Sequence, residues 1–277
     1  MQEIELMHLV WKPAGIEPFR NFVRAYREHP AGIDHKLAVL YNGFCGDDLD
    51  DHRELLTDTP HRELRLPENV LDIRAYVWGA QRTESRYLCF VNSYSTPLAS
   101  GWLRALHEQV AQPRVGAVGA TGSWESLYTN YLRGLNELGP PSSLTQRAKT
   151  LVRRLKLQRR RAHFYPAPNP HLRTNGFMIE RSRWLSLQIP PLRSKWDAWR
   201  FESGKEGMTR QLKSAGLEVL VVGRNGVAYQ NEKWRESDTF RNGNQENLLV
   251  ADNRTREYDE AGAEARRCLR LLAWGDG

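Results

Sequence analysis

The chain has 277 residues, of which 40% are hydrophobic and 26% are charged, and its formal net charge is +7. This is an ordinary globular composition, and the length allows one large domain or two small ones. No apolar run approaches the roughly 20 residues that span a bilayer, so we expect no transmembrane helix. Three widely spaced cysteines form no Cys-x-x-Cys pair, so we expect no zinc site and reduced thiols, as in a cytosolic protein.

The first elements alternate strand, helix and strand. Residues 5–11 (ELMHLVW) form an apolar run that predicts a strand, and apolar side chains at helical spacing predict a helix over residues 16–26. Residues 35–41 (HKLAVLY) predict a second strand, which leads into Asn42 and Gly43. Two strands joined by a helix within about 40 residues are typical of a parallel sheet with a right-handed crossover.

Another helix is predicted over residues 69–78 (NVLDIRAYVW), where an apolar stripe leaves Asp72 and Arg74 on another side. Residues 87–91 (YLCFV) then predict a buried strand, and the chain turns polar at Asn92-Ser93-Tyr94. In an α/β sheet, ligands bind just beyond the carboxyl ends of the strands. The polar turn is therefore a candidate site, although a simple strand cap would read the same way.

This stretch resembles the segment that holds the nucleotide sugar in GT-A glycosyltransferases, most closely family 2 and its relatives. The shared features are a strand, a polar tripeptide, Thr-Pro and, a few residues later, Gly-Trp-Leu. In the family the tripeptide is usually Asp-x-Asp, and its last aspartate binds the divalent ion that bridges the donor's diphosphate. Here Tyr94 takes that position, and a phenol that is neutral at neutral pH cannot replace an anionic ligand.

The resemblance implies roles for several residues. Asp72 would accept hydrogen bonds from the base or ribose of a nucleoside-diphosphate sugar, and Arg74 would hold phosphate. Mg or Mn is a possible cofactor, with Asn92 as a weak neutral ligand, but we expect weaker metal dependence than is usual for the family. The donor-binding residues expected in this half are Asn42, Asp72, Arg74, Asn92 and Ser93.

Residues 114–120 (RVGAVGA) predict a further strand, after which the composition changes. Proline-rich breaks at 139–141 and 166–170 enclose a basic insertion. Its basic block runs from Arg147 to Arg161 and contains no acidic residue. Such a block can meet nucleic acid, anionic lipid headgroups or a diphosphate, or it can be a solvated helix face. Because membrane-linked acceptors are common in the resembled family, we expect an anionic membrane surface or a lipid-linked acceptor.

The second half resembles the acceptor side and the catalytic segment of the family. Asn175 and Gly176 begin a predicted strand that resembles the acceptor-side strand. Residues 195–216 resemble the segment that holds the catalytic base, and Glu202 and Glu206 flank the expected place. We expect Glu202 to be the base, positioned just before a helix that starts near Lys205, with Glu206 complementing the dipole of its first turn. A strand over 217–222 and a closing helix over 260–274 complete the chain.

Together these features predict an α/β, GT-A-like (Rossmann-like) single domain with a mixed, mostly parallel sheet flanked by helices. We expect a glycosyltransferase domain over 1–230, divided into a nucleotide-sugar half (1–125), the basic insertion (126–170) and an acceptor half (171–230), followed by a C-terminal tail over 231–277. The expected activity is inverting, hexosyltransferase-like transfer to a glycan or lipid-linked acceptor in polysaccharide biosynthesis. The expected location is cytoplasmic, at the inner face of the membrane.

Two other classes stay open at this stage. One is a degenerate GT-A protein that binds nucleotide or glycan without catalysis, which the loss of the aspartate at Tyr94 favours. The other is a nucleic-acid-binding protein, for which the basic block is the motive. No RRM, KH or zinc motif supports nucleic-acid binding, so no nucleic acid is expected as a partner.

Overall fold

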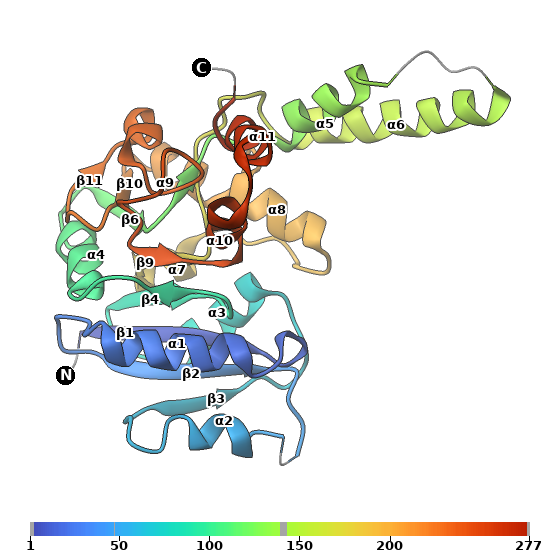
Figure 1. Ribbon diagram of the computed structural model, residues 1–277. Coiled ribbons are helices and arrows are strands. Elements are labelled where there is room, and N and C mark those ends of the chain that lie inside the picture. Colours follow the sequence, from blue (N-terminus) through green and yellow to red (C-terminus); the bar gives the residue numbers. More distant parts are fainter. Residues whose placement is uncertain (1–2, 47, 139–142, 276–277) are drawn as a thin grey trace.

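The computed structural model describes residues 3–46, 48–138 and 143–275 (Figure 1). The strands are β1 (Ile4–Trp11), β2 (Lys36–Asn42), β3 (Arg62–Arg65), β4 (Tyr87–Val91), β5 (Thr96–Pro97), β6 (Val115–Gly119), β7 (Gly122–Ser123), β8 (His171–Leu172), β9 (Gly176–Glu180), β10 (Glu218–Val222), β11 (Ala228–Tyr229) and β12 (Val250–Ala251). The helices are α1 (Glu17–Glu28), α2 (Asp50–Glu54), α3 (Asp72–Ala80), α4 (Trp102–Val110), α5 (Leu127–Asn136), α6 (Leu144–His163), α7 (Arg181–Ser186), α8 (Lys195–Ser203), α9 (Met208–Ser214), α10 (Asn253–Glu260) and α11 (Ala263–Trp274). Short 3-10 turns are η1 (Lys12–Ala14), η2 (Asn231–Lys233) and η3 (Arg235–Ser237).

In the described part of the chain, eight strands form one sheet in the order β11-β10-β6-β9-β4-β1-β2-β3. The β1–β2, β1–β4, β2–β3 and β6–β10 pairs are parallel. β9 runs antiparallel to both of its neighbours, β4 and β6, and β11 runs antiparallel to β10. A mixed, mostly parallel sheet flanked by helices is the architecture that the GT-A resemblance implies, so the predicted fold class is confirmed.

The strands form where apolar runs are buried on both faces of the sheet. All five residues of β4 and seven of the eight in β1 are buried, as parallel strands covered by helices require. The strands predicted over 5–11, 35–41 and 87–91 are each confirmed to within one residue at either end.

Helices cover the sheet on both faces and form two cores. On one face, Phe19 and Phe22 of α1 pack near Trp102 of α4. On the other, Tyr76 of α3 and Trp184 of α7 pack with residues of α8 and α9. Because both faces are closed, the edge at the carboxyl ends of the parallel strands is left for polar side chains.

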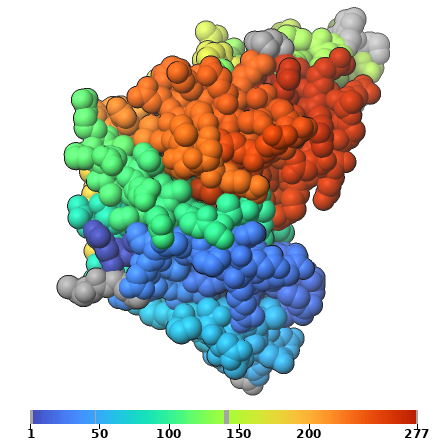
Figure 2. All heavy atoms as spheres, turned by 60° about the vertical axis from the view of Figure 1, so that its left-hand side comes forward, coloured from blue at the N-terminus to red at the C-terminus, as the bar shows by residue number. Residues whose placement is uncertain are grey.

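The predicted insertion contains the α5–α6 hairpin, which projects from the body of the molecule in Figure 1. The expected proline break at 139–141 lies outside the described residues. The C-terminal segment packs on the body: β12 pairs with β5, Trp274 is buried, and the Trp124 backbone amide donates to the Ala273 carbonyl. In Figure 2 this red segment forms a continuous surface with the orange segment before it. Among the described helices, none is long and apolar enough to cross a membrane.

Candidate functional site

The carboxyl ends of β1, β2 and β4 meet at one edge of the sheet. The Asn42 side chain exchanges two hydrogen bonds with the Val70 backbone, at 2.7 and 3.0 Å, which ties the loop before α3 to the end of β2. The Trp11 backbone amide donates to Ser93 Oγ at 3.1 Å. Asn42 and Ser93, both expected to bind the donor, therefore also hold the loops of this edge in place.

The polar turn after β4 is closed on itself. Asn92 Oδ1 accepts hydrogen bonds from the Tyr94 backbone amide and from Ser95 Oγ, both at 2.9 Å. This is the turn that an asparagine side chain makes with backbone two residues on. The Asn92 backbone amide donates to the Asn175 carbonyl at 3.1 Å, so the turn is attached to the start of β9.

Three consecutive residues before β9 connect the parts of the site. Arg173 pairs with Asp252 at 2.7 Å, and only 13% and 1% of these two side chains are exposed. The Thr174 backbone amide and Oγ1 donate to Glu202 Oε1 at 2.9 and 3.0 Å. Asn175 accepts a hydrogen bond from Thr121, while its own Nδ2 is buried and has no partner among the described residues. Asn175 thus presents a free donor beside Gly176, the pair expected on the acceptor side.

The predicted local structure around Glu202 is wrong. Glu202 lies in the last turn of α8, and Glu206 lies in the loop between α8 and α9 rather than in a first helical turn. Ser194 and Asp197 form a capping box that starts α8 earlier, and Gly204 then ends it by donating to the Arg200 carbonyl. Ser203-Gly204 therefore terminates a helix instead of leading into one.

Asp72 and Glu202 form the acidic centre of this edge. Asp72 starts α3, is half-buried, and accepts a hydrogen bond from the Ile73 amide. Burial and the negative charge of Glu202 raise the pKa of Asp72 to about 6. Two carboxylates from segments 130 positions apart are thus held close enough to repel each other, which is typical of a functional site.

Arg74 is not brought together with Asp72. Residues two positions apart on a helix do not face each other, and half of the Arg74 side chain is exposed, where it forms an ion pair with Glu68. The structure therefore separates two residues that were expected to share the donor site.

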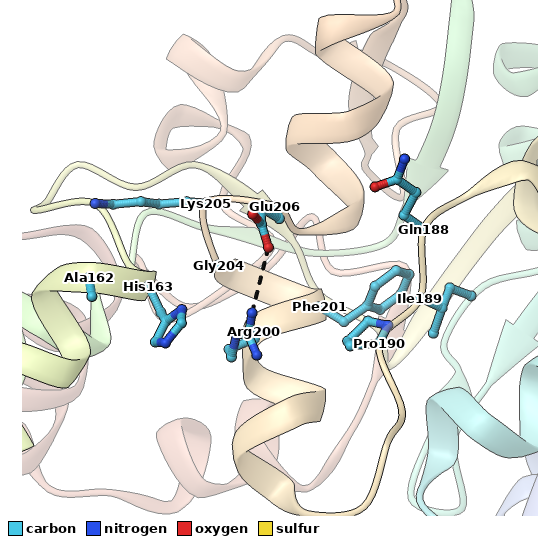
Figure 3. A pocket seen from close by; sticks show the side chains of 10 residues that line it. All are labelled: Ala162, His163, Gln188, Ile189, Pro190, Arg200, Phe201, Gly204, Lys205 and Glu206. Atoms are coloured by element: carbon cyan, nitrogen blue, oxygen red, sulfur yellow. Dashed lines mark ion pairs between the residues drawn. The ribbon is translucent and has the colours of Figure 1, made fainter.

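Glu206 also lies apart from this edge. It lines a hollow of about 310 Å³ together with Arg200, Lys205 and His163, and 88% of its side chain is exposed. Figure 3 shows its carboxylate directed at the Arg200 guanidinium, 3.5 Å away. None of Asp72, Asn92 and Glu202 is among the residues that line this hollow.

Sequence reasoning missed residues of the C-terminal segment. Arg256 of α10 donates to the Tyr94 carbonyl at 2.5 Å and to Thr96 Oγ1 at 3.3 Å. Burial alone would raise the pKa of Asp252, but the Arg173 guanidinium and three hydrogen bonds hold it below its ordinary value. No local pattern could have revealed these contacts, because the partners are 79 to 162 positions apart.

The tripeptide does not fit the divalent ion that the resemblance implies. The side-chain oxygen of Asn92 already accepts two hydrogen bonds within the turn, and Tyr94 brings no carboxylate. Among the described residues, no group of three or more His, Cys, Asp or Glu side chains is arranged to hold a metal ion. Hard divalent cations prefer several oxygen ligands, carboxylates above all, and the tripeptide does not supply them.

No protein-family model and no curated protein matches this chain. Similar solved structures include the mannosyltransferase PcManGT from Pyrobaculum calidifontis in complex with GDP-Man and Mn2+ (11% identity, TM-score 0.42, 65% of this chain and 45% of that one). A second is GalNAc-T7 with UDP, GalNAc and Mn2+ (12% identity, TM-score 0.42, 68% of this chain and 36% of that one). A third is S. aureus TarS 1–349 in complex with UDP-GlcNAc (9% identity, TM-score 0.34, 42% of this chain and 33% of that one). The chain thus spans less than half the length of each. Likeness at this level concerns the arrangement of sheet and helices alone.

Proposed function

We propose that the protein transfers a sugar from a nucleoside-diphosphate sugar to a glycan or lipid-linked acceptor with inversion, and that Glu202 is the general base. The observation that carries this proposal is the position of Glu202. Thr174 fixes one carboxylate oxygen, and the charge of Glu202 is near enough to raise the pKa of Asp72. The same short loop joins Glu202 to the Asn92 turn, where the sequence resemblance expects the donor.

In this mechanism Glu202 removes the proton from the acceptor hydroxyl, and its Oε2, the oxygen not held by Thr174, receives that proton. The hydroxyl oxygen forms a bond to the anomeric carbon while the bond from that carbon to the diphosphate breaks. The nucleoside diphosphate leaves with the electron pair. Holding the base by two hydrogen bonds fixes its direction before the substrate arrives.

The departing diphosphate needs positive charge, and Arg74 is directed away. We propose that Arg256 supplies this charge, because its guanidinium contacts the third residue of the tripeptide. Asp72, Asn92 and Ser93 remain the proposed contacts to the nucleoside and sugar. Asn175 Nδ2, buried and without a partner, is the proposed hydrogen-bond donor to the acceptor.

Glu202→Gln tests the proposal, with Glu206→Gln as the matched control. Gln keeps the shape and can still accept from Thr174, but it cannot take the acceptor's proton. Turnover, measured as release of nucleoside diphosphate from a panel of donors and acceptors, should fall by roughly 10²–10⁴-fold, while donor affinity stays within a few-fold. Normal turnover in Glu202→Gln together with its loss in Glu206→Gln would move the base to the hollow in Figure 3.

A second candidate function is nucleotide or glycan binding without transfer. The tripeptide favours binding without transfer, because the side-chain oxygen of Asn92 already accepts two hydrogen bonds within the turn and Tyr94 provides no anionic ligand. Calorimetry that shows donor binding, combined with no turnover by the wild-type protein for any donor and acceptor pair, would select this function. Likewise, the division at residue 230 between the transferase domain and the tail stays a proposal.

A further inference from the structure

The outer face of α6 is an exposed apolar stripe. Leu144, Leu151, Val152 and Leu155 have 81%, 61%, 51% and 57% of their surface exposed, and no residue of this 20-residue helix is buried. Exposed leucines and valines clustered on a single helix are uncommon on a soluble surface and mark an interaction site.

The stripe lies opposite the side of α6 that packs on α5. The half-buried residues of the helix include Thr150, Arg153, Leu157 and Arg160, spaced three and four apart, and the Arg160 guanidinium lies over the Tyr131 ring of α5 at 4.0 Å. At about 100° per residue, these positions form one side of the helix, and the apolar stripe centres on the other. The stripe therefore faces away from α5 and into solvent. Figure 1 shows that the hairpin carrying it projects from the body of the molecule.

Cations border the stripe along both flanks. Arg147, Arg154 and Arg161 recur every seven residues on one flank, and Lys149 and Lys156 do so on the other. Seven residues make almost two helical turns, so each set forms a nearly straight row. An apolar stripe between two basic rows is the pattern of a helix that lies in a membrane interface, its leucines among the acyl chains and its cations at the headgroups.

We propose that the outer face of α6 binds the surface of an anionic lipid bilayer, with the helix axis parallel to the membrane. A nucleic acid would meet the cations but leave the leucine stripe uncovered. A second copy of the helix would cover the stripe but place two sets of cations, with no acidic residue between them, against each other. An anionic lipid surface, which is apolar below and anionic above, satisfies both features.

The attached end of α6 links this surface to the site. Arg159 and Arg160 lie over the Trp196 ring of α8 at 4.4 and 5.6 Å, and Lys205 Nζ donates to the Arg161 carbonyl at 2.9 Å. Because α8 also carries Glu202, docking of α6 would hold the proposed base at a fixed height above the lipid. This last step, which favours a lipid-linked acceptor, rests on the proposed function; the docking itself does not.

The test is vesicle flotation of the full chain with neutral phosphatidylcholine and with phosphatidylcholine containing a quarter phosphatidylglycerol. We expect binding to the anionic vesicles that falls as salt rises, and little binding to neutral ones. Arg154→Gln/Lys156→Gln should weaken binding roughly 30-fold, at on the order of 1 kcal/mol for each cation. Leu151→Gln/Leu155→Gln should weaken it about tenfold or more with the charge unchanged. Arg267→Gln/Arg270→Gln, on exposed positions of α11, is the control and should bind like the wild type.

Equal binding to both kinds of vesicle, binding to neither, or an equal loss in the α11 control would overturn the proposal. Dimerisation that the leucine variant abolishes would assign the stripe to a second copy, and RNA binding lost only in the α6 charge variant would assign the cations to nucleic acid. Turnover with a water-soluble acceptor should be unchanged in the α6 variants. Failure of vesicle binding and failure of sugar transfer are thus scored separately.

Discussion

At the carboxyl edge of the sheet, polar side chains are held by specific hydrogen bonds and ion pairs, whereas along α6 apolar side chains are exposed between rows of cations. The edge joins distant segments, as in the Arg173–Asp252 pair, where at most 13% of either side chain is exposed. Neither α5 nor α6 contains a buried residue. Burial with specific partners fixes geometry, which proton transfer needs. An exposed amphipathic face leaves apolar surface unburied within its own chain, so that surface can still be buried against a partner.

The largest expected effect belongs to the body of the molecule and is its sensitivity to acid. His8 in β1 stacks on Phe22 at 3.7 Å, and neither ring nitrogen has a partner among the described residues. Burial lowers its pKa to about 3. The unfolded chain binds this proton below about pH 6.5 and the folded chain does not, so the free energy of unfolding should fall by up to about 5 kcal/mol between pH 6.5 and 3.

Denaturant titrations of wild type and His8→Phe at several pH values measure this effect. His8→Phe should flatten the pH dependence, whereas His29→Gln, at a less buried position on the surface, should leave it intact. If His8→Phe and wild type lose stability in parallel as the pH falls, other groups cause the acid sensitivity and the core histidine does not.

A smaller effect is expected at the acidic centre of the site, in the opposite direction. The pKa of Asp72 is raised to about 6, so the stability tied to this group is present at low pH and is lost as the pH rises from about 4 through 6. Asp72→Asn cannot ionise and should raise the free energy of unfolding at pH 7.5 by up to about 3 kcal/mol. This gain should fade by pH 4.

The comparison variant is Asp58→Asn, in an exposed turn, which should change stability by less than about 0.5 kcal/mol. If Asp72→Asn raises the free energy of unfolding and lowers turnover, the Asp72 carboxylate destabilises the fold and is needed for activity. An Asp72→Asn protein no more stable than wild type at pH 7.5 would mean that burial and the charge of Glu202 do not raise the pKa of Asp72.

The smallest effect separates two arginines. Arg256→Gln should weaken nucleoside-diphosphate binding by about 1.5–3 kcal/mol, the range for a hydrogen bond to a charged group. Arg74→Gln should leave affinity within about twofold, because Arg74 forms an exposed ion pair with Glu68. Calorimetry with UDP and with GDP measures these affinities. For each nucleotide we expect a similar affinity in chelator and in Mn2+. The reverse ranking of the two variants would return the donor site to the outer face of α3.

Much of the sheet could be predicted because a buried parallel strand is a continuous apolar run bounded by turn residues. Residues 87–91 are such a run and form β4 without adjustment. The antiparallel direction of β9 could not be predicted, since strand direction depends on pairing across the sheet. Glu202 was expected just before a helix that starts near Lys205, but it lies in the last turn of α8. The Ser-Gly pair permits a helix end as readily as a turn into the next helix.

The contacts of the C-terminal segment were beyond reach for a different reason. Arg256 reaches Tyr94 across 162 positions, and Arg173 reaches Asp252 across 79. Each of these arginines looks like an ordinary surface cation in its own segment. Only the folded chain shows that they lie at the site.

The pairing of β12 with β5 couples ligand binding at the Asn92 turn to docking of the last part of the chain. β5 follows the Asn92 turn directly, and Arg256 holds the Tyr94 carbonyl from α10. A ligand that orders the turn must therefore also favour the docked state of residues 250–275. By reciprocity, whatever favours that docked state raises affinity for the ligand by the same factor. The C-terminal segment thus contributes to the free energy of ligand binding at the candidate site, whichever ligand that site takes.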